Sequence, residues 1–262
     1  MYSTHRPASG TPPSSSDGAT SVHPAQQPTR RRPLVGLLKL VAILFGVAMG
    51  VAAFRLPVFA VTEVDVVGLH HLSEAAILSR VSVQGQNLLA LPVEDLTATL
   101  TQHPWVRDVE VQRRLMGRVT LFVTEREPAV IWEVGKQQFL IDRDGTVLET
   151  AKGDSPLPLI RDLDGAAPHP GDKLNADAVT LALTLTDILP KEIGQQAKFF
   201  EYLSYGGLVV QTDKGKRARF GDSSDVQWKL AVWKGLLQEG ETAKLKVGHV
   251  DLRFGDRPFF RP

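Results

Sequence analysis

The chain has 262 residues, no cysteine and a formal net charge of +1. This length allows one large domain, or two small domains with appendages. The lack of cysteine excludes both a disulfide framework and thiol chemistry. The charge is unevenly divided, because residues 1–55 have a net charge of +5 and the remainder has a net charge of −4. A slightly acidic main body has no electrostatic reason to bind nucleic acid, since phosphate binding needs clustered positive charge.

Residues 1–33 are polar, rich in Pro and Ser and without apolar periodicity, which predicts a disordered cytoplasmic tail. The stretch LVGLLKLVAILFGVAMGVAAF follows at 34–54, with Lys39 as its only charge. About 20 helical residues cross a hydrocarbon core of about 30 Å, so the sequence predicts a transmembrane helix over 34–55. The arginines at 30–32 then place the N-terminus in the cytoplasm and the body outside, as in a single-pass type II membrane protein.

A cleaved signal peptide, cut after VFA at 58–60, is the alternative interpretation of this start. Its leading polar region would be unusually long, and the apolar stretch exceeds the usual length of about 7–15 residues. A retained anchor in the cytoplasmic membrane is therefore the favoured interpretation.

Residues 59–128 predict a compact α+β unit of one strand, two helices and two strands. The alternation from Val61 to Val67 is typical of a half-buried strand. Ser73 is a good N-cap for a short helix. A second helix begins within NLLALPVEDL, with Pro92 in its first turn. The stretch HPWVRDVEVQRRLMGRVTLFVTEREP, at 103–128, then supplies two strands.

Residues 129–262 predict a mostly antiparallel β domain. Short apolar strands are separated by turn sequences, namely DRDG at 142–145, YGG at 205–207 and DKG at 213–215. The last recognisable strand is KVGHVDLRF at 246–254, and we expect it near a sheet edge.

Two helices are expected among these strands. We expect Asn175 to cap the first and Pro190 to stop it. The second is expected to be capped by Ser223 or Ser224, and its apolar stripe to run over Val226, Leu230, Trp233 and Leu237. Trp228 and Trp233 are both interpreted as core residues.

A search for catalytic or metal-binding patterns finds no phosphate-binding Gly loop, no GxSxG elbow and no HExxH pair. His70 and His71 are adjacent, so on a strand they point to opposite faces. The sequences DRDG and DLDG, at 142–145 and 162–165, begin like calcium loops. A glutamate is required at the twelfth position, where Gly153 and Lys173 stand, so both are interpreted as tight turns. The sequence therefore predicts no enzyme, no metal and no cofactor.

Two clusters of basic residues remain. The first flanks a hairpin turn at Lys214–Arg219, where a solvated hairpin is favoured and contact with an acidic partner stays open. The second lies in the two strands of 103–128. There we expect cross-strand ion pairs between its arginines and the neighbouring carboxylates; the residues are Arg107, Arg113, Arg114 and Arg118 with Asp108, Glu110 and Glu125.

The tail, the span and the α+β unit beginning TEVDVVG together resemble the FtsQ/DivIB family of bacterial cell-division proteins. The segments GQNLL, HPWVRDVEV and VTEREPAV are similar to the POTRA unit of this family, and LIDRDGTVL and HVDLRF to its β domain. The resemblance covers residues 30–260. One departure is LMGR at 115–118, where the family commonly has proline in place of Met116, and this change should loosen the hairpin.

The resemblance implies a non-enzymatic scaffold at the division septum. It would recruit the small coiled-coil membrane proteins FtsB and FtsL and help control septal peptidoglycan synthesis. In the family a partner segment pairs with the last strands of the β domain, and the POTRA domain and membrane span serve other divisome proteins. The matching partner-binding positions here are Arg253, Phe254, Asp256, Phe259 and Phe260. No nucleic acid and no small-molecule substrate are implied.

Two other classes of function stay open. One is a POTRA-bearing, membrane-anchored docking module of an export or envelope-assembly system. The other is an extracytoplasmic wall enzyme, which the lack of any nucleophile or metal pattern disfavours.

Overall fold

The computed structural model describes residues 33–54, 59–114, 116–242, 248–253 and 259–261. The chain divides into two compact units, Met1–Ala52 and Ala53–Pro262. The tail predicted to be disordered lies outside the described residues, apart from Pro33.

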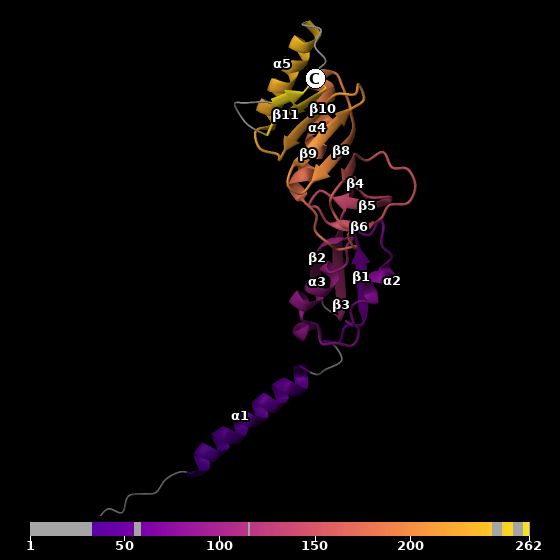
Figure 1. Ribbon diagram of the computed structural model, residues 1–262. Coiled ribbons are helices and arrows are strands. Elements are labelled where there is room, and N and C mark those ends of the chain that lie inside the picture. Colours follow the sequence, from indigo (N-terminus) through magenta and orange to yellow (C-terminus); the bar gives the residue numbers. More distant parts are fainter. Residues whose placement is uncertain (1–32, 55–58, 115, 243–247, 254–258, 262) are drawn as a thin grey trace, which may run out of the picture. The chain divides into compact units, whose positions relative to one another are not determined.

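Helix α1, Pro33–Phe54, contains all the described residues of the first unit and lies where the membrane span was predicted (Figure 1). Its large apolar side chains that the structure describes are exposed, from Leu37 to Phe54. Among the described residues, no helix is both long enough and apolar enough to cross a membrane. The predicted span therefore stays a prediction.

The second unit begins with a three-stranded sheet in the order β1-β3-β2, where β1 is parallel and β2 antiparallel to β3. Two short helices and one 3₁₀ turn connect β1 to β2. The elements are β1 Glu63–Val67, α2 Glu74–Leu78, η2 Leu88–Ala90, α3 Val93–Thr101, β2 Val106–Arg114 and β3 Arg118–Glu125. The predicted order of elements is thus confirmed.

Helices α2 and α3 carry the buried side chains that cover this sheet. Ser73 caps α2 as predicted, because its hydroxyl oxygen accepts a hydrogen bond from the Ala76 N–H. Pro92 precedes α3 and is not in its first turn, since residues 88–90 form a separate 3₁₀ turn. Leu96 and Leu100 then face a core built with Val109, Val119 and Leu121, which are fully or almost fully buried.

The β2–β3 hairpin forms although Met116 stands where the family commonly has proline. The pairing runs from Val106↔Glu125 to Arg114↔Arg118. Met116 itself is 85% exposed and has φ 68°. The next residue, Gly117, has φ +74°, and a Cβ there would lie 2.2 Å from the Ala60 carbonyl oxygen. Glycine is therefore required at this turn by both backbone conformation and space.

A nine-stranded mixed sheet follows, in the order β12-β11-β10-β9-β8-β7-β4-β5-β6. Neighbouring strands are antiparallel except in the pairs β4/β7, β7/β8 and β10/β11. The strands are β4 Pro128–Val134, β5 Gln137–Asp142, β6 Val147–Thr150, β7 Leu159–Asp162, β8 Ala197–Leu203, β9 Gly207–Thr212, β10 Arg217–Gly221, β11 His249–Asp251 and β12 Phe259–Arg261. The predicted turns at 142–145, 205–207 and 213–215 connect consecutive strands, as expected.

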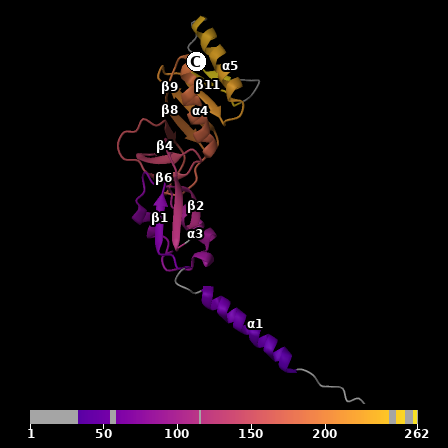
Figure 2. The same ribbon diagram turned by 180° about the vertical axis from the view of Figure 1, so that it is seen from behind.

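One face of this sheet packs against helices α4, Ala176–Ile193, and α5, Val226–Thr242 (Figure 1 and Figure 2). One row of apolar side chains on that face crosses six of the strands, and each residue in it pairs with the next. The row is Trp132, Ile160, Phe200, Val210, Ala218 and Val250, all of them at most 1% exposed. This row joined to the two helices is the main hydrophobic core.

Helix α4 begins as predicted, with the Asn175 side chain accepting from the Ala178 N–H. The prediction that Pro190 stops it is wrong, because the helix runs on to Ile193 and ends at Gly194, which has φ +62°. Proline removes one backbone N–H donor from a helix interior. Leu189 is fully buried and Ile193 packs against the core, and this burial offsets the lost hydrogen bond.

Helix α5 buries Leu230, Trp233 and Leu237 as predicted. Neither Ser223 nor Ser224 is its N-cap, however. The helix begins at Val226, and both serine hydroxyls donate to aspartates that lie outside the helix. Trp228 was interpreted as a core residue, but it is 42% exposed and lies on the opposite side of the helix.

Candidate functional site

The edge of the nine-stranded sheet is formed by the last two strands of the chain. β12 pairs antiparallel with β11, with Asp251↔Phe259 and Val250↔Phe260. Within the described chain, no other strand pairs with the outer side of β12. The predicted strand 246–254 is shorter than expected, since β11 covers only His249–Asp251 and the described residues beside it, 248 and 252–253, do not belong to a strand.

Of the five predicted partner-binding residues, three lie among the described residues. Phe259 and Phe260 belong to the edge strand β12. Arg253 follows β11 and is half-buried. Phe254 and Asp256 lie outside the described residues.

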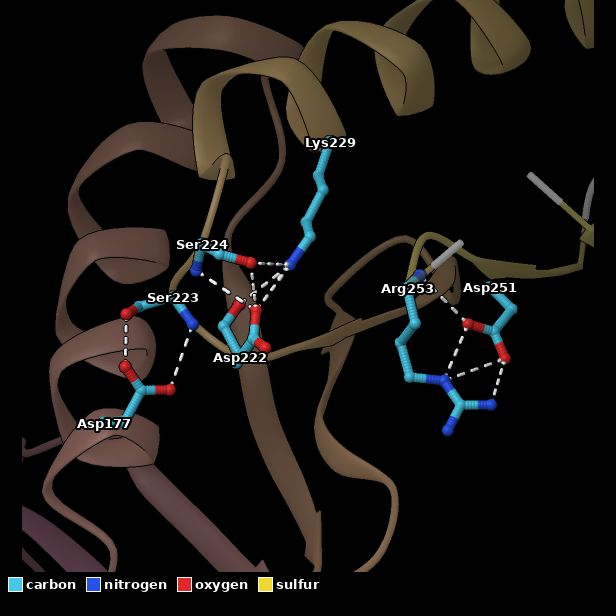
Figure 3. Close-up of polar contacts among 7 residues, drawn as sticks. All are labelled: Asp177, Asp222, Ser223, Ser224, Lys229, Asp251 and Arg253. Atoms are coloured by element: carbon cyan, nitrogen blue, oxygen red, sulfur yellow. Dashed lines mark hydrogen bonds and ion pairs between the residues drawn. The ribbon is translucent and has the colours of Figure 1, made fainter. Parts of the chain in front are cut away.

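Arg253 forms a close ion pair with Asp251, two residues earlier on β11 (Figure 3). Its Nε donates to Oδ1 at 3.0 Å, one terminal nitrogen donates to Oδ2 at 2.8 Å, and its backbone N–H donates to Oδ1 at 3.2 Å. Such a forked contact fixes the plane of the guanidinium. Burial alone would raise the pKa of Asp251, but the hydrogen bonds from Arg253 outweigh it and lower that pKa. The same contact raises the pKa of Arg253.

Arg253 borders a polar pocket of about 300 Å³. Its wall is formed by the ends of β8, β9 and β10 and by the first turns of α4 and α5. Its polar lining side chains include Asp177, Asp222, Ser224, Lys229 and Arg253. Tyr205, at the β8–β9 turn, also lines the pocket and is 80% exposed.

Lys229 is the buried cation of this pocket, with only 5% of the residue exposed. Its ammonium donates to Asp222 Oδ1 at 2.9 Å and to the Asp222 carbonyl at 3.1 Å (Figure 3). The Ser224 hydroxyl also donates to Asp222. The hydrogen bonds from Ser224, and next those from Lys229, lower the pKa of Asp222 to about 2. These contacts hold the 221–225 loop against α5.

A second contact holds the same loop against α4. The Ser223 N–H donates to Asp177 Oδ2 at 3.0 Å, and the Ser223 hydroxyl donates to the other oxygen of that carboxylate (Figure 3). The loop that follows β10 is therefore fixed from both helices.

The sheet face opposite α4 and α5 carries a row of alternating charges that ends at the same edge. Adjacent positions pair in register from β5 to β12, and the row is Gln138, Glu133, Arg161, Glu201, Val209, Arg219, Asp251 and Phe259. Arg161 and Glu133 form an ion pair at 3.1 Å. Asp251 thus links the charged face of the sheet to the edge strand.

The basic hairpin Lys214–Arg219 contributes to this face. Arg217 forms an ion pair with Glu201 on β8. Arg219 lies in the charged row and lowers the pKa of Asp251, although its effect is smaller than that of Arg253. Lys214 is exposed at the turn. Whether a partner contacts this hairpin stays a prediction.

The arginines of β2 and β3 do not form the cross-strand pairs expected within their hairpin. Arg107 pairs with Asp144 on the β5–β6 turn, and Arg118 pairs with Glu63 on β1. Arg113 donates to the Leu91 carbonyl. The expectation was wrong because the sequence does not show that β1 lies beside β3, or that the β5–β6 turn lies beside β2.

Glu125 and His71 also have structural contacts. The Glu125 carboxylate accepts from the His71 N–H at 2.7 Å and from the Leu72 N–H at 2.9 Å. His71 stacks on Trp105 with ring centroids 3.7 Å apart.

The DRDG turn at 142–145 is stabilised by its own first aspartate, because Asp142 Oδ1 accepts hydrogen bonds from the backbone N–H groups of Asp144 and Thr146.

Sequence reasoning missed Gly221, Asp222 and Lys229. A lysine at position 229 lies within the apolar stripe of α5, one residue before buried Leu230, and that placement indicates a buried cation in need of a carboxylate. Nothing in the sequence shows that Gly221 lies against Arg253.

The chain has a small α+β domain and then a mixed sheet, with helices on one face of the sheet and the last strand of the chain at its edge. This arrangement defines a protein of the POTRA-and-β-domain class. Residues 59–126 match the family model for the POTRA domain, FtsQ-type. Residues 130–253 match that for Cell division protein FtsQ/DivIB, C-terminal.

Similar proteins carry the same description. The chain is 31% identical over 185 residues to Cell division protein FtsQ of Chloroflexus aurantiacus. These aligned residues cover 70% of this chain and 68% of the relative. It is 29% identical over 184 residues to Cell division protein FtsQ of Chloroflexus aggregans, with 70% and 68% covered. It is 22% identical over 220 residues to Cell division protein DivIB of Clostridium botulinum, with 79% and 83% covered. The chain belongs to the FtsQ/DivIB family of cell-division proteins.

Membership in this family supports a role in cell division at the division site, through interactions with other divisome proteins. The family is one of scaffolds and is not known for catalysis.

Proposed function

We propose that this chain is a non-enzymatic divisome scaffold that recruits FtsB- and FtsL-like partners and helps control septal peptidoglycan synthesis. The observation that carries the proposal is the edge strand β12, whose outer side pairs with no other strand of the described chain. An open edge offers unpaired N–H and C=O groups, and an incoming strand satisfies them. The partner segment adds to β12 and extends the sheet by one strand.

The residues around the edge supply specificity in this proposal. Arg253 holds an acidic side chain of the partner, and its fork to Asp251 keeps it oriented beside the edge. Phe259 and Phe260 on β12, with Phe254 and Asp256 in the preceding segment, supply further contacts. Aromatic and arginine side chains at the centre of an interface commonly carry a large share of the binding energy.

A proline scan of β12 tests the mode of binding. Proline removes a backbone donor, so it blocks strand addition where the N–H faces the partner. Phe259, Phe260 and Arg261 are replaced one at a time by proline and, as matched controls, by alanine. The dissociation constant is measured for a purified extracytoplasmic segment of the FtsB-like protein from the same genome. We expect alternating sensitivity to proline that alanine does not reproduce. Equal loss with proline and alanine at each position would point to side-chain contacts without strand addition.

The proposed partner-binding residues Arg253 and Phe254, which are adjacent in the chain, are tested by alanine substitution. Arg253→Ala and Phe254→Ala are each expected to weaken binding by about 2 kcal/mol if the residue is a hot spot. Lys136→Ala, at the exposed β4–β5 turn, is the matched surface control. Unchanged affinity with an intact fold would remove the residue concerned from the site.

Membrane anchoring belongs to the same proposal. Residues 34–55 form the anchor of a single-pass protein, the N-terminus is cytoplasmic, and POTRA residues 59–128 and β-domain residues 129–262 are extracytoplasmic. The support is the apolar sequence of α1, its exposed apolar side chains and the arginines that precede it. The test is alkaline extraction of cell membranes combined with protease protection of each end of the chain. Release of the full chain by alkali would refute the anchor.

Location in the cell is tested by imaging an N-terminal fluorescent fusion at native expression level. A band at mid-cell that tracks constriction is expected. A functional fusion spread evenly over the envelope would contradict the proposed recruitment role.

A further inference from the structure

We infer that Gly221 is a positioning residue for Arg253, because the missing side chain at 221 leaves the space in which the Arg253 stem lies. The inference rests on the proposed function and deepens it, since it names a residue that sets the partner contact without touching the partner. Any Cβ at 221 displaces Arg253 and weakens the docking of a partner strand at β12.

The geometry around Gly221 carries this inference. A Cβ built on Gly221 would lie 2.8 Å from Arg253 Cγ and 3.2 Å from its Cδ. Carbon atoms in favourable contact are about 3.5–4.0 Å apart, so the two groups cannot both keep their places. The three nearest atoms to that Cβ all belong to Arg253.

The backbone at Gly221 has little freedom to move away. Gly221 pairs with Leu208 on β9. On its other side, the loop is fixed by Asp222 to Lys229 and by Ser223 to Asp177 (Figure 3). A Cβ on Gly207 would lie 2.1 Å from the Gly221 carbonyl oxygen, so these two backbones are already in close contact. The Arg253 side chain is therefore the group that yields.

Displacement of the Arg253 stem breaks the fork to Asp251. The fork needs Nε at 3.0 Å from Oδ1 and a terminal nitrogen at 2.8 Å from Oδ2, and both depend on the position of Cγ and Cδ. Asp251 pairs directly with Phe259 on the edge strand. An altered Arg253 therefore changes the surface beside β12 while the core stays intact.

Gly221→Ala is compared with Gly153→Ala as a matched control. Gly221 has φ +78° and Gly153 has φ +77°, so alanine meets the same backbone strain at both positions. A Cβ at Gly153, however, has no atom within 4 Å. The two variants therefore impose the same backbone strain, and only Gly221→Ala brings the new methyl group against another side chain.

Two measurements on the purified extracytoplasmic chain separate position from binding. The first is the ¹H–¹⁵N NMR signal of the Arg253 side-chain Nε–H, assigned with Arg253→Lys. The second is the dissociation constant for the FtsB-like segment named above. Gly221→Ala is expected to shift or broaden the Nε–H signal and to weaken binding about tenfold, while Gly153→Ala changes neither. An unchanged signal and affinity in Gly221→Ala would overturn the inference.

A double-mutant cycle with Arg253→Ala completes the test. If Gly221 acts through Arg253, Gly221→Ala causes no further loss of affinity in the Arg253→Ala background. Additive losses would show that Gly221 acts on the fold, and the positioning role would fall. If Arg253→Ala weakens binding and Gly221→Ala does not, the inference fails and the proposed function stands. If neither Arg253→Ala nor the β12 prolines affect binding, the proposed docking site fails as well.

Discussion

A guanidinium nitrogen of Arg126 donates a hydrogen bond to Asp142 Oδ2 at 2.6 Å, and both side chains are largely buried. Arg126 follows β3, at the end of the POTRA match, and Asp142 ends β5 in the nine-stranded sheet. The other oxygen of Asp142 accepts from the backbone of the β5–β6 turn. The pair therefore joins the two domains through a carboxylate that also shapes a turn.

Arg126→Ala is predicted to destabilise the chain by about 3 kcal/mol, because it leaves the buried Asp142 charge without its cation. The control is Arg118→Ala, which removes an exposed pair with Glu63 and is expected to lower stability by less than about 1 kcal/mol. Urea unfolding at pH 7 measures both variants. Equal losses of unfolding free energy in the two variants would show that burial of the Arg126–Asp142 pair does not increase its contribution to stability.

Leu185→Ala is predicted to lower the free energy of unfolding by about 3 kcal/mol. Leu185 is fully buried between α4 and the sheet, and truncation leaves a cavity as well as lost contacts. Leu163→Ala is the matched control, since this leucine is 54% exposed at the end of β7. The comparison uses denaturant unfolding followed by the fluorescence of the buried tryptophans. A loss at Leu163 as large as at Leu185 would contradict the assignment of the core.

Gly207→Ala is predicted to lower the stability of the fold by more than the strain of its backbone conformation alone would cause. Its φ is +66°, and an added Cβ would lie 2.1 Å from the Gly221 carbonyl oxygen, a backbone atom that cannot rotate away. Gly135 has φ +63° with no atom within 4 Å, so Gly135→Ala reports the strain alone, about 1 kcal/mol. Thermal unfolding of the two variants gives the difference. Equal shifts in Tm would mean that β9 and β10 can separate at this point.

How far the sequence predicts this molecule depends on how local each contact is. The order of elements, the caps at Ser73 and Asn175 and the tight turns follow from short patterns and are present in the structure. The partners of Arg107 and Arg118 were missed, because they depend on which strands and turns lie side by side. Pro190 was misjudged because burial of Ile193 outweighs a local helix-stopping preference.

In the candidate site, too, local features are predictable from the sequence and long-range contacts are not. Position along the chain and the family resemblance lead to Arg253, Phe259 and Phe260. The contact of Gly221 with Arg253 brings together the ends of β10 and β11, which are joined only through α5. No short pattern encodes that contact, so only the folded chain reveals it.

Asp222 is predicted to give a stability contribution that depends on pH. Its pKa in the folded chain is about 2, below the ordinary aspartate value of 3.8, owing to the hydrogen bonds from Ser224 and Lys229. Above about pH 5 the carboxylate is ionised in both states, and the full contribution is present. Between the two pKa values the unfolded chain binds a proton that the folded chain does not, so the contribution declines as the pH falls and is lost near pH 2.

The measurement is the difference in unfolding free energy between the unaltered chain and Asp222→Asn, followed by urea unfolding from pH 6 to pH 2. We expect the difference to be constant above about pH 5 and to shrink below it, since the variant has no carboxylate at 222 to titrate. Asp154→Asn makes the same change of net charge in an exposed loop and controls for general electrostatics. A difference that does not change with pH would show that Lys229 and Ser224 do not stabilise the ionised form of Asp222, and that another contact fixes the 221–225 loop.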